Sequence, residues 1–421
     1  MKTVENYNVK IYTDNIEDSA REQIKELLSI DVFSKCKIRI MPDVHAGAGC
    51  VIGFTGDLGD KVIPNIVGVD IGCGILVQPF VCMNDIDYHA LNEFILHHIP
   101  SGRNYRDNLY APLPQKYMDV YCEAKDIIKQ LRCYRELKET KRLNASIGSL
   151  GGGNHFIELD KDECGISYLV VHTGSRNLGK QVAQIYQKLA VKCQSGWAEL
   201  MEEQNRMIAE YKAAGRKDAL QDAIRQLHNS FKMCKPTIPP DLSYLEGAYR
   251  EDYLHDMRLC QHWAKMNRSL IANLIMDYFI SQGYVELMQN DLAFESVHNY
   301  IGDDNIIRKG AIAAYEGQKR IIPLNMRDGS LICIGKGNED WNNSAPHGAG
   351  RIMSRSQAFK SISMDEYRAS MQGIYSESLS EETKDESPMV YKPKDEIIGN
   401  IRDTVSIVNV IKPVYNFKAA E

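Results

Sequence analysis

The stretch Ser167-Tyr168-Leu169-Val170-Val171-His172-Thr173-Gly174-Ser175-Arg176 runs from a continuous apolar segment straight into a histidine and a glycine turn. The apolar run predicts a buried strand that delivers His172 from its end. Further strands are expected at 36–41, which alternates and ends at Pro42, and within 51–80, where short apolar runs alternate with glycine. The chain is therefore expected to adopt a mixed α/β (α+β) fold whose strand ends and glycine loops surround one central site.

Helices are expected mainly in one block of the chain. Residues 179–283 are helix-rich and predict a helical insertion, broken at the proline-rich segment 236–240. Its expected helices span residues 180–214, 217–233 and 253–282, and a further helix is expected at 17–30. Near the C-terminus, the polar and acidic residues 376–387 predict an exposed, flexible loop, whereas 397–418 return to strand-like alternation.

The composition is that of a globular protein, with 44% hydrophobic and 25% charged residues among 421. Chains of this length often contain two or three domains. The motifs described below are dispersed over most of the length, so residues 1–421 are expected to fold as a single domain. We expect this domain to act as a monomer.

The chain lacks the features of an exported or membrane protein. Its N-terminus has no basic start followed by an apolar run, and no stretch approaches a membrane span of about 18 apolar residues. The eleven cysteines include no Cys-x-x-Cys pair, which indicates reduced thiols and a cytoplasmic protein. With a net charge of −6, nucleic-acid binding would need a local basic patch. The candidate patches are residues 138–142, Arg308 with Lys309, Lys319 with Arg320, and Arg351 with Arg355.

Glycines gather around single metal-binding or nucleophilic residues in segments far apart in the chain. Five such segments are Asp70-Ile71-Gly72-Cys73-Gly74, Gly151-Gly152-Gly153-Asn154-His155-Phe156, His172-Thr173-Gly174-Ser175-Arg176, His298-Asn299-Tyr300 and His347-Gly348-Ala349-Gly350-Arg351. Glycine beside a ligand lets the backbone turn sharply and approach a metal or a phosphate. The five segments therefore predict one convergent site.

One carboxylate, one thiolate and three imidazoles supply the predicted metal ligands: Asp70, Cys73, His155, His172 and His298. Five donors exceed the needs of one tetrahedral ion that keeps an open position. They suit two ions with a bridging ligand, for which the Cys73 thiolate is the natural choice. Paired ions can clamp the attacking and leaving oxygens of a phosphoryl displacement. The donor types alone leave zinc, iron and manganese open, and cysteine favours zinc.

In this order the five segments resemble the RtcB family of GTP-dependent RNA ligases. Met41-Pro42-Asp43-Val44-His45-Ala46-Gly47 and Tyr253-Leu254-His255-Asp256-Met257 extend the likeness, which runs from near residue 40 to the C-terminus. The resemblance implies two manganese ions on the five donors, bridged by Cys73, and a His347 that is guanylylated by GTP. The implied reaction joins RNA 3′-phosphate or 2′,3′-cyclic phosphate ends to 5′-hydroxyl ends, through an RNA-3′-pp-G intermediate, in RNA splicing or repair.

The resemblance also implies a set of guanine-nucleotide contacts. These are Asn154, His155, Phe156, Glu158, Asn299, Pro323, Leu324, Asn325, Met326, Ser330, His347, Gly348, Ala349, Gly350, Tyr391 and Lys418. Asn and Glu suit a guanine edge or a ribose, lysine suits O6 or a phosphate, and glycine-flanked amides suit phosphate oxygens. Arg351 is placed to neutralise a phosphate. The remaining candidates are Arg176, Asn267 and Arg268 for RNA phosphates, and Asp43 and His45 for orienting the metal ligands or His347.

Two segments depart from the family pattern, Ile322-Pro323-Leu324-Asn325-Met326-Arg327 and Ser344-Ala345-Pro346. Both fall at the expected nucleotide pocket, as in a divergent bacterial paralogue specialised for repair. Two other functions use the same residues: a dinuclear metal-dependent phosphoesterase or nuclease without a nucleotidylated histidine, and a non-catalytic RNA-binding paralogue. The physiological RNA and the need for an activating partner are left open.

Overall fold

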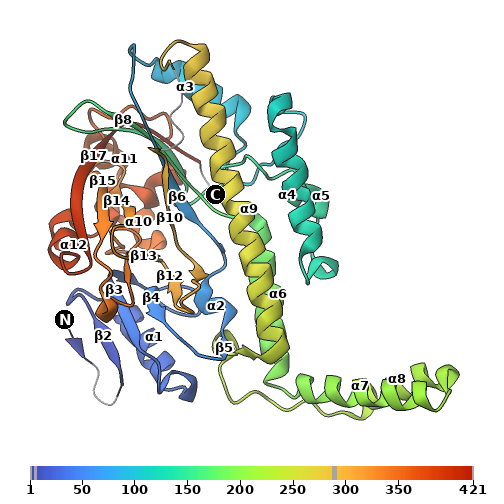
Figure 1. Ribbon diagram of the computed structural model, residues 1–421. Coiled ribbons are helices and arrows are strands. Elements are labelled where there is room, and N and C mark those ends of the chain that lie inside the picture. The colour runs from blue at the N-terminus through green and yellow to red at the C-terminus, as the bar shows by residue number, and fades with distance from the viewer. Residues whose placement is uncertain (1, 4–6, 287–291, 420–421) are drawn as a thin grey trace.

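The computed structural model describes residues 2–3, 7–286 and 292–419, and it contains two large β-sheets flanked by helices (Figure 1). The six-stranded sheet has the order β1 (Lys2–Thr3), β2 (Val9–Ile11), β3 (Ile38–His45), β4 (Ile52–Gly56), β12 (Ile307–Lys309) and β11 (Tyr300–Ile301). The seven-stranded sheet has the order β10 (Phe294–Val297), β6 (Gly74–Phe80), β8 (Ser167–Thr173), β7 (Phe156–Lys161), β17 (Val405–Lys418), β15 (Gly329–Gly335) and β14 (Lys319–Asn325). Two short pairs, β13 (Ala311–Ala313) with β16 (Ser344–Pro346) and β5 (Lys61–Val62) with β9 (Leu245–Glu246), complete the strands. The mixed α/β fold expected from the sequence is confirmed.

The seven-stranded sheet is antiparallel throughout and curls until its two edge strands meet. The amide of Ile321 in β14 donates to the hydroxyl of Ser296 in β10 at 2.8 Å. The inner face encloses an apolar cluster from several strands, including Val77, Val170 and Ile332. Because successive side chains on a strand point to opposite faces, the other face buries a second cluster against the helices.

The helices cover the outside of the sheets. They are α1 (Asp18–Leu28), α2 (Pro64–Val67), α3 (Tyr88–His98), α4 (Met118–Gln130), α5 (Thr140–Asn144), α6 (Arg176–Cys193), α7 (Trp197–Ala213), α8 (Lys217–Ser230), α9 (Gly247–Ser281), α10 (Arg355–Ser361), α11 (Met364–Ser370) and α12 (Lys394–Asn400). Helix α9 runs the length of the molecule beside α6, while α7 and α8 project away from the body (Figure 1). Among the described helices, even the 35-residue α9 lacks the run of apolar residues that crossing a membrane requires.

Two predicted elements differ from the structure in their bounds. The helix expected over 180–214 is divided into α6 and α7, because Gly196 adopts a left-handed φ of 94° between them. The strand expected to end at Pro42 continues to His45. Its pairing with β4 is irregular between Ile40 and His45, so the missing N–H of Pro42 costs no ladder hydrogen bond.

The segment 376–387 is not the exposed loop predicted from its polar, acidic composition. It contains a 3-10 helix, Glu381–Glu386, in which Thr383, Lys384, Asp385 and Glu386 are buried. Burial is tolerated because the charged groups meet partners from distant segments, among them Lys418 and Arg351. The expected strand over 397–418 is likewise shorter, since its first residues belong to α12.

Candidate metal centre and adjoining cavity

Four neighbouring strands of the seven-stranded sheet bring the five predicted metal ligands together at one end of the strands. Asp70 and Cys73 precede β6, His155 precedes β7, His172 lies near the end of β8, and His298 follows β10. The register pairs Gly74 with both Thr173 and Val297, and Phe156 with His172. Because these strands are antiparallel, the start of β6 and β7 lies beside the end of β8 and β10. Residues up to 228 positions apart, Asp70 and His298, therefore converge.

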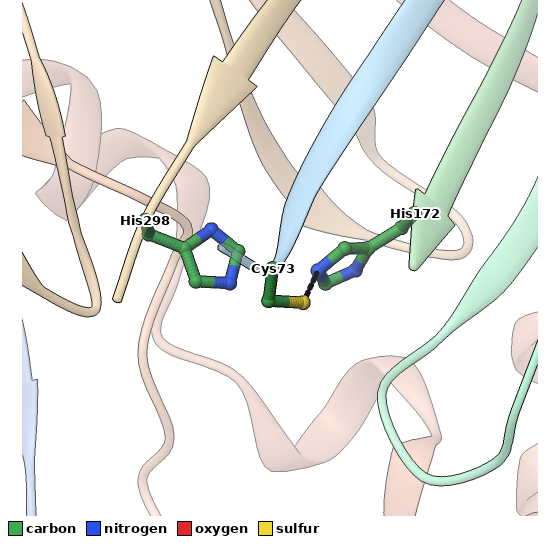
Figure 2. A group of neighbouring side chains, drawn as sticks. All are labelled: Cys73, His172 and His298. Atoms are coloured by element: carbon green, nitrogen blue, oxygen red, sulfur yellow. Dashed lines mark hydrogen bonds between the residues drawn. The ribbon is translucent and has the colours of Figure 1, made fainter. Parts of the chain in front are cut away.

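The donors form two groups of three that share Cys73. In each group, Cys73 with His172 and His298 or Asp70 with Cys73 and His155, the ligand atoms lie within 4.8 Å of one another. Figure 2 shows the two imidazoles of the first group on either side of the Cys73 thiol. The Cys73 Sγ lies 3.4 Å from the Nε2 atoms of both His155 and His172. This arrangement is a possible metal site with the shared ligand that the sequence predicted.

The donor side chains are buried, and burial favours uncharged imidazoles that can bind a metal ion. Burial lowers the pKa of His172 and of His298 well below the usual value, so both imidazoles are neutral and offer a lone pair. His155 donates from Nδ1 to the carbonyl of Leu150 at 3.0 Å, which directs its Nε2 toward the other donors, 3.0 Å from Oδ2 of Asp70. Burial likewise raises the pKa of the Cys73 thiol. Metal binding at this site would therefore displace the Cys73 proton.

Small residues are needed where the backbone closes around Asp70. A Cβ on Gly174 would lie 2.4 Å from both carboxylate oxygens of Asp70, and one on Gly151 would lie 2.7 Å from Nδ1 of His155. Such distances leave no room for a methyl group. Glycine at these two positions therefore allows the backbone to approach the donors closely, as the glycines near the ligands predicted.

Replacing Gly174 with alanine is expected to displace the Asp70 carboxylate and weaken metal binding by about 10- to 100-fold. Gly399 in α12 is the matched control, because a Cβ there meets nothing within 4 Å. Titration calorimetry with a divalent ion on the metal-free proteins measures the effect. Equal affinities for Gly174→Ala, Gly399→Ala and the parent protein would contradict this reading of the Asp70 contact.

A cavity of about 610 Å³ opens beside the donor cluster. Of the residues predicted from the family resemblance, those on its wall are Asn154, Phe156, Glu158, Pro323, Leu324, Asn325, Met326, His347, Gly348, Ala349, Gly350, Tyr391 and Lys418. His45, His172 and Arg351 also line it. The cavity wall thus includes His172 of the donor cluster and most of the residues predicted to contact the nucleotide.

Some predicted nucleotide contacts lie behind this wall. Asn299 has a left-handed φ of 60° and donates to the carbonyl of Asp70 at 3.2 Å, while its Oδ1 accepts the Gly310 amide at 2.9 Å. It therefore shapes the ligand loop. Ser330 is buried in β15. His155 belongs to the donor cluster.

His347 lies on the cavity wall with one ring nitrogen already engaged. Its Nδ1 is 2.7 Å from Oδ2 of the buried Asp43, and its backbone amide donates to the same oxygen at 3.2 Å. The carboxylate fixes the proton on Nδ1 and leaves the Nε2 lone pair available. The His347 ring is tilted against that of His298, with centroids 4.7 Å apart, so the imidazole lies close to one of the metal ligands. His45 donates from Nδ1 to the carbonyl of Asp43 at 2.8 Å, and burial lowers its pKa to about 4.

The cavity wall also holds a carboxylate, a lysine and a tyrosine. Asn416 donates to Glu158 at 2.6 Å, and burial raises the pKa of Glu158 to about 7. Lys418 and Tyr391 both donate to Glu386, at 2.7 and 2.5 Å. Sequence reasoning missed Asn416 and Glu386. A signal existed for Asn416, which lies two residues before Lys418 on one strand, but the acidic segment around Glu386 gave none.

The residues predicted to contact RNA phosphates all form hydrogen bonds within the protein. Asn267 and Arg268 are buried in α9, where Asn267 accepts from the Gly148 amide at 2.8 Å and Arg268 donates to the carbonyls of Gly72 and Thr173. In this structure their polar groups support the ligand loops, and their contact with an RNA phosphate stays a prediction. Arg176 also bonds within the protein, to the Gly102 carbonyl at 2.7 Å. Arg308 and Lys309, a predicted basic patch, are buried as well.

Comparison with known proteins agrees with this architecture. Residues 23–419 match the family model described as tRNA-splicing ligase RtcB. The RNA-splicing ligase RtcB of Escherichia coli K12 is 29% identical over 98% of this chain and 97% of its own length. The tRNA-splicing ligase RtcB of Methanococcus maripaludis is 26% identical over 96% of this chain and 92% of its own length. The chain therefore belongs to the RtcB family.

Proposed function

We propose that this protein is a GTP-dependent RNA ligase that joins RNA 3′-phosphate or 2′,3′-cyclic phosphate ends to 5′-hydroxyl ends. The observation that carries the proposal is His347, whose Nδ1 is held by Asp43 on the wall of a cavity that His172 of the donor cluster also lines. A phosphoesterase would need the donors but no nucleotidylated histidine. Family membership supports the same reaction class. All eleven cysteines are free thiols, which supports action in the cytoplasm.

In the proposed first step, Nε2 of His347 attacks the α-phosphorus of GTP. The N–P bond forms as the bond to pyrophosphate breaks, and the Asp43 carboxylate stabilises the positive charge that develops on the ring. The GMP then passes to an RNA 3′-phosphate, and His347 is released. Attack of the 5′-hydroxyl on this activated phosphate forms the phosphodiester and releases GMP. The oriented histidine thus divides one difficult displacement into easier ones.

We propose that Asp70, Cys73 and His155 hold one manganese ion and that Cys73, His172 and His298 hold the other. The two donor groups with a common thiol support this division. Bound divalent ions would supply positive charge to the phosphoryl oxygens of each displacement. Phe156, Pro323 and the loop from Gly348 to Gly350 would enclose the nucleotide, and Arg351 would neutralise phosphate.

Covalent labelling tests the proposal directly. The protein is incubated with Mn²⁺ and GTP labelled on either the α- or the γ-phosphate, then denatured and separated on a gel. We expect label from α-labelled GTP only, and ligation of a 3′-phosphate RNA to a 5′-hydroxyl RNA in the same mixture. Absence of label in the metal-loaded protein, with RNA 3′-phosphate ends present, would contradict the ligase. Hydrolysis of phosphoesters by that preparation would then identify a phosphoesterase.

The proposed reaction should depend on the ionisation of Glu158. A carboxylate at this position would accept hydrogen bonds from guanine, and its protonated form would not. Because burial raises the pKa of Glu158 to about 7, kcat/KM for GTP should fall below this pH, approaching about tenfold per pH unit. Labelling rates across this range in the wild type and in Glu158→Gln provide the measurement. The variant should show a low, flatter profile, and an unchanged inflection in the variant would assign it to another group.

A further inference from the structure

Glu386 connects three cavity residues that come from separate parts of the chain. It is 2% exposed. Its Oε2 accepts from Lys418 Nζ at 2.7 Å and from the Tyr391 hydroxyl at 2.5 Å, and its Oε1 accepts from Arg351 at 3.2 Å. Charge-assisted bonds of this kind are about twice as strong as neutral ones. One carboxylate therefore restrains the lysine, the tyrosine and the arginine at once.

The turn that carries Glu386 is itself held firmly. Ser380 and Thr383 form reciprocal hydrogen bonds at the start of the 3-10 helix Glu381–Glu386, and Thr383 also donates to the Ser378 carbonyl at 2.6 Å. The neighbouring Asp385 pairs with Arg355 at 3.3 Å. The position of the carboxylate is thus set by the protein and does not depend on a bound ligand.

Two of the carboxylates that line the cavity, Glu158 and Glu386, differ in their free hydrogen-bonding capacity. Glu386 receives three donors from the protein, whereas Glu158 receives Asn416. Lys418 Nζ lies 5.9 Å from the centre of the Phe156 ring and pairs with Glu386, and its positive charge also acts on Glu158. Of these two carboxylates, Glu158 is therefore the one available to a ligand, while Glu386 acts as the counter-ion that fixes Lys418.

A fixed ammonium beside an available carboxylate discriminates between purines. Guanine presents an acceptor at O6, and its N1 and N2 are donors, whereas adenine presents a donor at N6. Lys418 can donate to O6 while Glu158 accepts from N1 and N2. The N6 amino group of adenine would meet the ammonium and leave buried polar groups unpaired, which is a strong basis for rejection.

We propose that Glu386 is a positioning residue that fixes Lys418 and thereby sets the preference for guanine over adenine nucleotides. The inference rests on the proposed function, since it assigns this cavity to the nucleotide. Glu386 acts only through the residues it holds.

Glutamine at position 386 keeps the shape of the side chain and removes its charge. For Glu386→Gln we expect KM for GTP to rise roughly tenfold, while kcat for labelling of His347 stays within about twofold. The preference for a fluorescent GTP analogue over competing ATP should fall by a similar factor. Glu381→Gln is the matched control, because Glu381 lies in the same short helix but is exposed, and it pairs with Lys384 and not with a residue of the cavity wall. The thermal midpoint of each variant confirms folding.

A double-mutant cycle with Lys418→Ala separates positioning from a general structural role. If Glu386 acts through Lys418, Glu386→Gln should add little to the loss caused by Lys418→Ala. Fully additive losses, or an unchanged KM in Glu386→Gln, would overturn the inference. So would tighter GTP binding, which would mean that the carboxylate competes with the nucleotide. A wild type that takes no label at all would instead refute the proposed ligase reaction.

Discussion

Replacing His347 with alanine is expected to abolish covalent labelling by α-labelled GTP and to reduce ligation by on the order of 10⁴-fold or more. The nitrogen that would form the N–P bond is lost, and no change in binding can compensate for a missing nucleophile. The Asp43 carboxylate, 2.7 Å from Nδ1 of His347, predicts a second, graded result. Asp43→Asn keeps the geometry but weakens the charge, so labelling should be slower and still detectable.

The control for His347→Ala is His97→Ala, which removes an exposed histidine from α3. This variant should label and ligate like the wild type. Persistence of the GMP adduct in His347→Ala would move the nucleophile to another residue. Equal GTP affinity in His347→Ala and the wild type would support a role in chemistry more than in binding.

Replacing Cys73 with alanine should remove both proposed metal ions at once. Cys73 belongs to both donor groups, whereas His298 belongs to one. Each ion is expected to contribute several kcal/mol of charge stabilisation, so activity should fall by on the order of 10³-fold or more. Metal content by mass spectrometry should decrease from two ions in the wild type to none in Cys73→Ala, and to one in His298→Ala.

The difference in metal content between Cys73→Ala and His298→Ala tests whether the two ions share the thiol. Cys260→Ala is a suitable control, since it removes another buried thiol of the same chain. It should retain the wild-type metal content. If Cys73→Ala keeps one ion, the thiol is not shared. If it keeps both, the metal site lies elsewhere.

The donor cluster could be predicted because its signals are local. Each ligand has a glycine or asparagine within two residues, and the apolar run before His172 predicted the strand that presents it. The burial of Asn267 and Arg268 could not be predicted in this way. Their burial follows from contacts with segments far away in the sequence, Gly148 for Asn267 and Gly72 and Thr173 for Arg268.

The burial of Glu386 in a charged segment could not be predicted from the local sequence either. Acidic residues with few apolar neighbours usually stay in solvent. Here the compensating cations come from residues 32 and 35 positions away, Lys418 and Arg351. Composition cannot show that these charges meet, because the pairing depends on how β17 and the His347 loop pack together. The residues of the cavity wall were thus predicted without Glu386, which holds three of them.

The register of the curled sheet has a consequence for how the chain reaches its native state. Slipping β8 by one residue against β6 would turn His172 to the opposite face and destroy one donor group, since side chains alternate along a strand. Ions that bind the five donors would therefore favour only correctly paired strands, and mass action would deplete the mispaired ones. The proposed metal centre would thus select the native register of the sheet whose strands carry its ligands. A chelator present during refolding would remove that selection.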